Sequence, residues 1–206
     1  GFREDGVEIV VALFRAIVDI ESVSHYEREL ADAIETTLRG CAHLELIRDG
    51  DAVMARTDLG RGERVIIAGH LDTVPVDGNL PSTTTGTGDQ IIVHGRGTCD
   101  MKGGIAVMVW LAQRLAAPNR DITWVFYDCE EIEDTANGLR RLAADHPDWL
   151  EADLAVLMEP TSARIEGGCQ GTTRFDITTT GVAAHSARSW LGHNAIHDIA
   201  DVLERA

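Results

Sequence analysis

Three short apolar segments of this sequence, each typical of a buried strand, run directly into a histidine or a carboxylate. Residues 65–68 lead into Gly-His-Leu-Asp at 69–72, and residues 122–127 lead into Asp-Cys-Glu-Glu at 128–131. Residues 154–158 lead into Glu159. In open parallel sheets, ligands bind outside the carboxyl ends of the strands. The pattern therefore predicts a parallel sheet with a polar crevice at one edge.

Helical patterns alternate with these strands. Apolar residues recur at helical spacing over 7–20, and we expect further helices at 27–38, 101–115 and 135–144, and short strands at 44–47, 52–55 and 91–93. Asp100 stands at the expected N-cap of the helix that starts at 101. The stretch 75–88, rich in Pro, Ser, Thr and Gly, indicates a loop. This alternation predicts an α/β fold, with a mainly parallel sheet flanked by helices on both faces.

The composition of the sequence changes after Glu159. Glycines interrupt residues 167–171, the alternation at 173–180 predicts a strand, and 194–204 predicts a helix. One strand and one helix cannot bury a core of their own. Either this tail packs onto the preceding domain or it begins a second one. We place the boundary between a first domain, residues 1–164, and this tail, residues 165–206.

Charge and composition exclude several classes of function. The 206 residues contain 18 Lys and Arg against 34 Asp and Glu, a net charge of −16. Such an acidic surface disfavours nucleic acid and anionic membranes as partners. The longest apolar runs are shorter than the roughly 20 residues of a membrane span, and the N-terminus lacks a signal-peptide pattern. No CxxC pair is present, so we expect reduced cysteines in a cytoplasmic protein, namely Cys41, Cys99, Cys129 and Cys169.

A metal site explains the polar strand ends best. Residues two apart on an extended segment face the same way, so His70 and Asp72 share a face. Several carboxylates in one crevice raise each other's pKa, and a bound divalent cation removes that penalty. Histidine and carboxylates without thiolate suit a catalytic zinc, cobalt or manganese ion. Of the adjacent Glu130 and Glu131, one can bind metal while the other acts as general base.

Each of these residues taken alone has a simpler explanation. A histidine after a strand is usually a hydrogen-bonded core or surface residue, and Asp100 would be a helix cap. Asp72 would be a turn residue before Pro75, and the adjacent glutamates would be part of a solvated loop. Glu159 would be an exposed strand end. The simultaneous placement of all of them at strand ends favours a site.

Four motifs carry a resemblance to a known family. The segments GHLDTVP (69–75), GRGTCDMKGG (95–104), CEE (129–131) and MEPT (158–161) resemble the co-catalytic zinc aminoacylase, dipeptidase and carboxypeptidase family in order and spacing. The wider phrases FYDCEE, GGCQGT and AHSARSWLGHNAIH are similar to the actinobacterial succinyl-diaminopimelate desuccinylases of that family. Acetylornithine deacetylases and related peptidases share the metal motifs and remain alternatives. A non-catalytic metal-binding fragment is a further alternative.

The resemblance implies a zinc exopeptidase-like domain that hydrolyses the amide of a small N-acyl amino acid. It implies two Zn²⁺ ions, with Co²⁺ as the alternative, bridged by Asp100. His70 and Glu159 would hold one ion and Glu131 the other. Asp72 would orient the His70 ring, Glu130 would transfer protons, and the Asp100–Met101 peptide bond would be cis.

The resemblance extends into the tail. The segment GVAAHSARS (181–189) resembles the start of the family's α+β lid and dimerisation domain, in which His185 would reach the active site of a second copy in a homodimer. Family members run to nearly twice this length and carry a last ligand histidine near their C-terminus. Because the sequence stops at Ala206, within the expected first lid helix, we expect it to bind one metal at His70, Asp100 and Glu159. We also expect weak activity or none.

Overall fold

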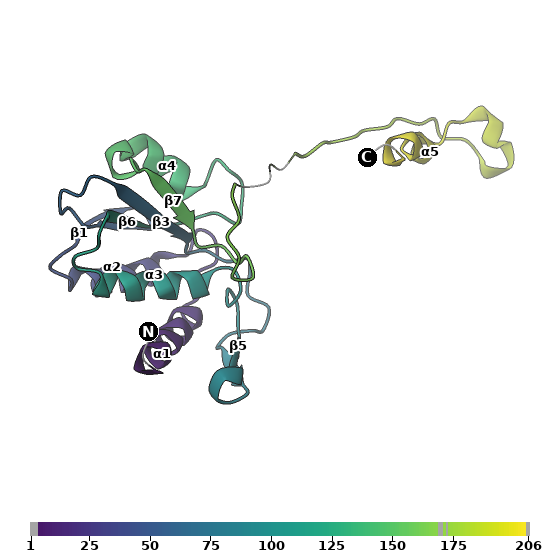
Figure 1. Ribbon diagram of the computed structural model, residues 1–206. Helices are drawn as coiled ribbons and strands as arrows, with labels where there is room; N and C mark the ends of the chain where they lie inside the picture. Colours follow the sequence, from purple (N-terminus) through teal and green to yellow (C-terminus); the bar gives the residue numbers. More distant parts are fainter. Residues whose placement is uncertain (1–3, 169–170, 172, 205–206) are drawn as a thin grey trace. The chain divides into compact units, whose positions relative to one another are not determined.

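The computed structural model describes residues 4–168, 171 and 173–204. The chain divides into two compact units, Gly1–Arg164 and Ile165–Ala206 (Figure 1). The interpretation of the second unit as the beginning of a lid domain stays a prediction.

The first unit is built on a five-stranded sheet of order β1-β2-β6-β3-β7. Strands β6, β3 and β7 are parallel, whereas the β1–β2 and β2–β6 pairings are antiparallel. The α/β class is confirmed, and the sheet is mixed, with its parallel part in the strands that precede the predicted site residues. The strands are β1 (Glu45–Asp49), β2 (Ala52–Arg56), β3 (Arg64–His70), β6 (Asp121–Tyr127) and β7 (Leu154–Leu157).

Helices cover both faces of this sheet, as predicted (Figure 1). On one face, α1 (Glu4–Asp19), α2 (Arg28–Arg39) and α3 (Lys102–Arg114) pack in a core that includes Leu30, Ile105 and Trp124. Apolar side chains spaced three and four apart on α2 and α3 explain this packing. On the other face, α4 (Gly138–Asp145) and the short helix η2 (Pro147–Trp149) contribute Leu142 and Trp149 to a second core.

Strand β7 differs from the prediction of a buried strand. It lies at the edge of the sheet, and Leu154, Val156 and Leu157 are 58%, 40% and 51% exposed. A run of apolar residues predicts a strand equally well at the centre or at the edge, so the sequence pattern could not make this distinction.

A hairpin lies within and after the segment expected to be an irregular loop. Strand β4 (Thr83–Thr85) pairs antiparallel with β5 (Ile92–His94), and a 3₁₀ turn, η1 (Gly88–Gln90), lies between them. Gly86 has a φ of +78°, and a Cβ there would lie 2.0 Å from the carbonyl oxygen of Gln90, so this turn requires glycine. The prediction of a loop over 75–88 was wrong for β4.

The second unit contains less regular structure than predicted. Residues 173–180 form no strand in the part of the chain that the structure describes, because no neighbouring strand there offers a ladder. The expected helix at 194–204 is two short helices, α5 (Ala195–Asp198) and α6 (Ala200–Leu203), preceded by η3 (Ser186–Leu191). Ile196 and Leu203 are 77% and 70% exposed, so little packing stabilises a longer helix.

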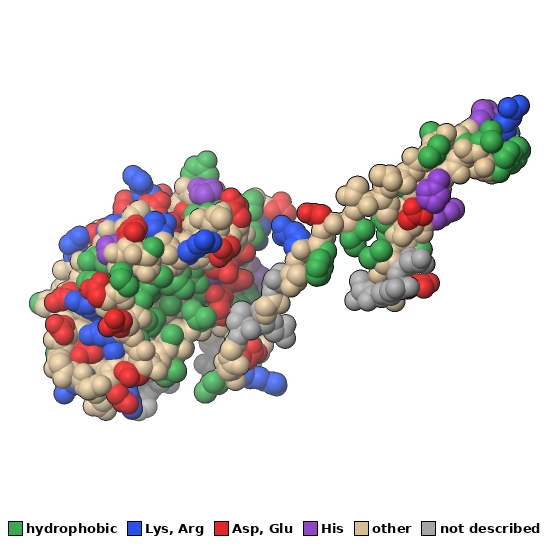
Figure 2. All heavy atoms as spheres, turned by 90° about the horizontal axis from the view of Figure 1, so that it is seen from above, with side chains coloured by type: hydrophobic (Ala, Val, Ile, Leu, Met, Phe, Trp, Pro, Cys, Tyr) green, Lys and Arg blue, Asp and Glu red, His purple; other side chains and the backbone are tan. Residues whose placement is uncertain are grey.

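Charged side chains on the described surface are interspersed. Figure 2 shows acidic side chains spread over one face of the first unit, with basic ones between them and an area of hydrophobic side chains. Among the described residues, no helix has both the length and the apolar character needed to cross a membrane. Cys41, Cys99 and Cys129 are free cysteines, and Cys169 lies outside the described residues.

Candidate metal centre

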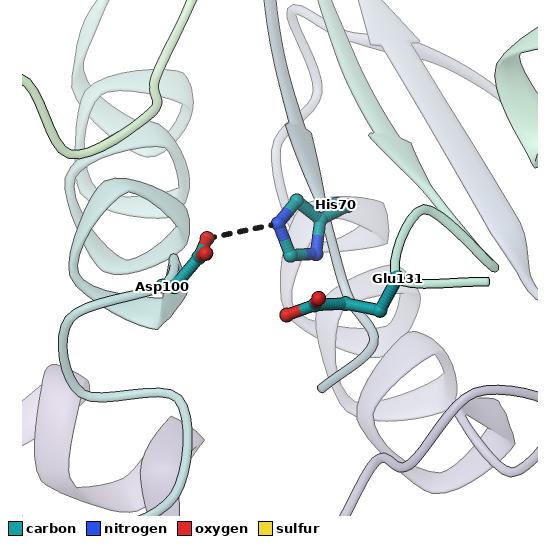
Figure 3. A group of neighbouring side chains, drawn as sticks. All are labelled: His70, Asp100 and Glu131. Atoms are coloured by element: carbon teal, nitrogen blue, oxygen red, sulfur yellow. Dashed lines mark hydrogen bonds and ion pairs between the residues drawn. The ribbon is translucent and has the colours of Figure 1, made fainter. Parts of the chain in front are cut away.

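His70 is the last residue of β3, and contacts fix its ring on both sides. The side chain is 1% exposed. Nδ1 lies 3.0 Å from the backbone oxygen of Asp72 and 3.3 Å from its carboxylate Oδ1. These oxygens only accept hydrogen bonds, so Nδ1 carries a proton. Nε2 faces the other way, 3.1 Å from Oδ1 of Asp100 (Figure 3). This nitrogen is therefore the one available to a metal.

The backbone behind His70 packs against the loop that carries Asp100. The N–H of His70 donates to Sδ of Met101 at 3.3 Å. A Cβ on Gly69 would lie 2.5 Å from Cε of Met101, so a larger residue at this position would displace the Met101 side chain. The Asp100–Met101 peptide bond is cis, as the resemblance implied.

Helix α3 begins one residue later than the sequence suggested. Met101, not Asp100, occupies the N-cap, and the helix starts at Lys102. The predicted capping position of Asp100 was therefore wrong by one residue. The side chain of Asp100 is 52% exposed and turns toward His70.

Asp72 holds the backbone of the two adjacent glutamates. Its Oδ1 accepts the N–H of Glu130 at 2.9 Å, and its Oδ2 accepts the N–H of Glu131 at 3.0 Å. Oδ2 also accepts the hydroxyl of Ser24 at 2.7 Å. Burial alone would raise the pKa of Asp72, but these donors and His70 hold it below its usual value. Asp72 thus connects the histidine to the loop after β6.

The side chains of His70, Asp100 and Glu131 converge (Figure 3). One potential ligand atom from each lies within 4.8 Å of the other two. Glu159, which follows β7, places Oε1 3.9 Å from Nε2 of His70. Glu130 lies next to Glu131 and is exposed. The ends of three parallel strands and one loop therefore bring together the residues predicted for the first unit.

The electrostatics of this group favour a cation. Burial, followed by the charge of Asp100, raises the pKa of Glu131. Burial also raises the pKa of Glu159; His70 opposes this effect, and the nearby carboxylates of Asp100 and Glu130 add to it. For His70, burial lowers the pKa, but the hydrogen bond that its ring donates to Asp72 and the surrounding carboxylates raise it to about 9. A divalent ion would replace the Nε2 proton and relieve the repulsion between carboxylates. The nitrogen and oxygen donors fit such an ion.

His185 lies in the second unit, just before η3. It is exposed, and its Nδ1 accepts the N–H of Ala187 at 3.1 Å. The role implied for His185 concerns a second copy of the chain and stays a prediction.

Two residues between α1 and α2 support the site without having been predicted, and one buried lysine was also missed. Ser24 contacts Asp72, and Glu27, fully buried, accepts the N–H of Cys129 at 3.0 Å. Lys102 is also buried, and its ammonium group donates to the backbone oxygen of Ile20 at 2.6 Å. Each resembles an ordinary helix-end residue in the sequence, and the contacts that distinguish them join distant parts of the chain.

Comparison with known proteins agrees with this geometry. The family described as "Peptidase family M20/M25/M40" matches residues 66–203. The chain belongs to this family. The matched stretch contains every predicted site residue, from His70 to His185. Membership of the M20/M25/M40 family makes the chain part of a metal-dependent hydrolase family and implies a divalent metal at the centre.

Similar M20/M25/M40 proteins include two from actinobacteria. A Mycobacterium tuberculosis protein bearing the name succinyl-diaminopimelate desuccinylase DapE is 54% identical over 204 residues, which are 98% of this chain and 55% of that protein. The succinyl-diaminopimelate desuccinylase of Corynebacterium glutamicum is 44% identical over 200 residues, 95% of this chain and 53% of that enzyme. The chain spans about half the length of these curated relatives.

Solved structures of M20/M25/M40 peptidases share the fold. A tripeptidase from Staphylococcus aureus superposes with a TM-score of 0.68 at 18% identity, covering 96% of this chain and 56% of that one. The aminopeptidase PepT from Bacillus cereus gives the same TM-score at 17% identity and the same coverage. At this identity the likeness shows the fold alone.

Proposed function

We propose that this chain forms the catalytic part of a metal-dependent amide hydrolase that releases succinate from N-succinyl-L,L-diaminopimelate, in diaminopimelate and lysine biosynthesis. The observation that carries the proposal is the convergence of His70, Asp100 and Glu131 within 4.8 Å, with Glu130 adjacent. The substrate is supported by 54% and 44% identity to relatives named as desuccinylases.

Four residues would hold the metal. In this chain His70, Asp100 and Glu159 would bind one Zn²⁺ ion, with Co²⁺ as an alternative metal. In a protein of the relatives' full length, Glu131 would hold a second ion and Asp100 would be shared between the two. A divalent ion bound here supplies Lewis acidity toward the amide carbonyl of the substrate.

Glu130 would move the proton during hydrolysis. Its backbone is fixed by the hydrogen bond to Asp72, while its side chain is exposed. In this position its carboxylate would accept a proton from the attacking water and return it to the nitrogen of the leaving amine. Asp72 would act through His70. The oxygens of Asp72 accept a hydrogen bond from the His70 Nδ1–H, and this bond orients Nε2 toward the metal centre.

The proposal includes a cytoplasmic homodimer. His185 of one copy would donate a hydrogen bond to the oxyanion that develops on the substrate bound by the other copy. The exposure of His185 within its own unit is compatible with such a role.

The variant Glu130→Gln tests the central assignment. In a protein of the relatives' full length, we expect this variant to lower hydrolysis of N-succinyl-L,L-diaminopimelate by about 10²- to 10⁴-fold, with zinc content by elemental analysis unchanged. Loss of zinc would instead identify Glu130 as a ligand.

A mixture of Glu130→Gln with His185→Ala tests the role of His185. Mixing should restore activity at about a quarter of the active sites if His185 acts between copies, and at none if it acts within one copy.

Parallel assays test the substrate. Faster turnover of N-acetylornithine or of a dipeptide would replace the desuccinylase assignment with one of the related activities. Stoichiometric zinc binding without turnover of any of the three substrates would support a non-catalytic metal-binding protein.

A further inference from the structure

A second buried carboxylate lies next to the segment that carries the two glutamates. Glu27, the residue before α2, is 0% exposed. Its Oε1 accepts the N–H of Cys129 at 3.0 Å and lies 3.5 Å from the Cys129 Sγ. Asp72 accepts the next two N–H groups, those of Glu130 and Glu131. Two buried carboxylates thus hold three consecutive backbone amides.

The backbone at Cys129 needs such support. Its φ is +57°, in the left-handed region that residues other than glycine seldom adopt. His25, whose Nδ1 lies 3.5 Å from the Cys129 Sγ, also has a left-handed φ of +74°. Conformations of this kind persist only where surrounding contacts determine them. The contact between residues 25–27 and Cys129 therefore fixes the turn from which Glu130 and Glu131 extend.

Burial of the Glu27 carboxylate should lower the stability of the fold rather than raise it. Its second oxygen, Oε2, is buried and has no hydrogen-bond partner among the residues that the structure describes. A buried carboxylate with an unsatisfied oxygen destabilises the folded state. Residues that break a local packing rule in this way are concentrated at functional sites. The contact of Glu27 with the loop after β6 therefore indicates the functional role of this residue.

We propose that Glu27 is a positioning residue, which holds the turn at Cys129 so that Glu131 can bind the cation and Glu130 can reach the substrate. The proposal rests on the proposed function for the roles of the two glutamates. The ordering of the turn itself can be measured without any substrate.

Three variants separate positioning from a general effect on stability. Glu27→Gln keeps a carbonyl oxygen that can accept the Cys129 N–H, whereas Glu27→Met has similar length and no acceptor. Thr57→Ala is the matched control. Thr57 is fully buried, and its hydroxyl donates to Asp121 at 2.8 Å and accepts the N–H of Ile122 at 3.0 Å. These contacts lie at the start of β6, the opposite end of the strand from Cys129.

Two measurements apply to each variant: hydrogen–deuterium exchange of the peptide containing residues 129–131, and a Co²⁺ titration followed by its visible absorption spectrum. In Glu27→Met, the peptide should exchange faster and Co²⁺ affinity should fall by roughly 10- to 100-fold, the usual effect of removing a residue that supports a ligand. Glu27→Gln should restore both toward the wild-type values. Thr57→Ala should lower overall stability while leaving both unchanged.

Unchanged exchange and Co²⁺ affinity in Glu27→Met would overturn the proposal, as would equal effects in Thr57→Ala or a failure of glutamine to restore either property. If Glu27→Met does not fold, Glu27→Ala replaces it in the same comparison. Because neither measurement uses substrate, a positive result here combined with no desuccinylase activity would reject only the proposed function.

Discussion

Two adjacent glycines in the first turn of α3 should respond in opposite ways to replacement by alanine. A Cβ on Gly103 would meet no atom nearer than the backbone oxygen of Thr98, at 3.8 Å. A Cβ on Gly104 would lie only 2.5 Å from the backbone oxygen of Met158. Met158 immediately precedes Glu159, so the substitution at Gly104 would press on the segment that carries a proposed ligand.

The expected difference follows from these two distances. Alanine in place of glycine at an unstrained helical position stabilises a protein by about 0.4–1 kcal/mol, and both sites share this gain. At Gly104 the new methyl group would be about 1 Å inside the ordinary contact distance of about 3.5 Å. Overpacking of this kind costs about 1–3 kcal/mol. The opposing atom belongs to backbone at the end of β7, so we expect a difference of about 2–3 kcal/mol between the two variants.

Urea unfolding followed by circular dichroism measures this difference. Gly103→Ala should keep or raise the midpoint, and Gly104→Ala should lower it at an unchanged slope. A Co²⁺ titration should show weaker binding in Gly104→Ala only, because Glu159 is displaced. Equal midpoints for the two variants would refute the reasoning, since they differ in nothing but the position of one methyl group.

Two buried carboxylates yield further predictions. Asp72→Asn should lower the free energy of unfolding by about 3 kcal/mol. The new amide nitrogen would face the N–H of Glu130 or Glu131 and leave a buried donor unpaired. A variant as stable in urea as the wild type would contradict this. At Asp121, burial raises the pKa, but two backbone N–H groups, a hydroxyl and a nearby arginine together lower it. A lowered pKa contributes stability that is complete above the unfolded value of about 3.9 and is lost as pH falls through the folded pKa. Asp121→Asn should therefore flatten the loss of stability below about pH 4, and parallel pH profiles of unfolding would argue against it.

The part of the site that could be predicted from the sequence is the part set by local pattern. An apolar strand followed at once by a polar residue is visible in the chain, and parallel pairing then places His70, Glu131 and Glu159 at one edge of the sheet. Their convergence is a consequence of topology. The start of α3 was missed by one residue because hydrophobic periodicity does not fix the terminal residue of a helix.

The supporting residues could not be predicted because their contacts are not local. Ser24 reaches Asp72 across 48 positions, and Glu27 reaches Cys129 across 102. In the sequence these are a serine and a glutamate near the start of a helix, where such residues are common caps. The exposure of β7 could not be predicted either, since the sequence pattern does not reveal which strand lies at the edge of a sheet.

The structure also separates the carboxylates that hold the fold from those available to a cation. Asp72 receives hydrogen bonds from donors on both oxygens, and its pKa is lowered, so its charge is already compensated by the protein. Burial and neighbouring carboxylates raise the pKa of Glu131 and Glu159, against the opposing effect of His70. A bound cation would compensate the charge that His70 leaves unbalanced. Glu27 shares the raised pKa but is fully buried beside Cys129. Glu27 therefore supports the backbone that positions the ligands, rather than binding the metal itself.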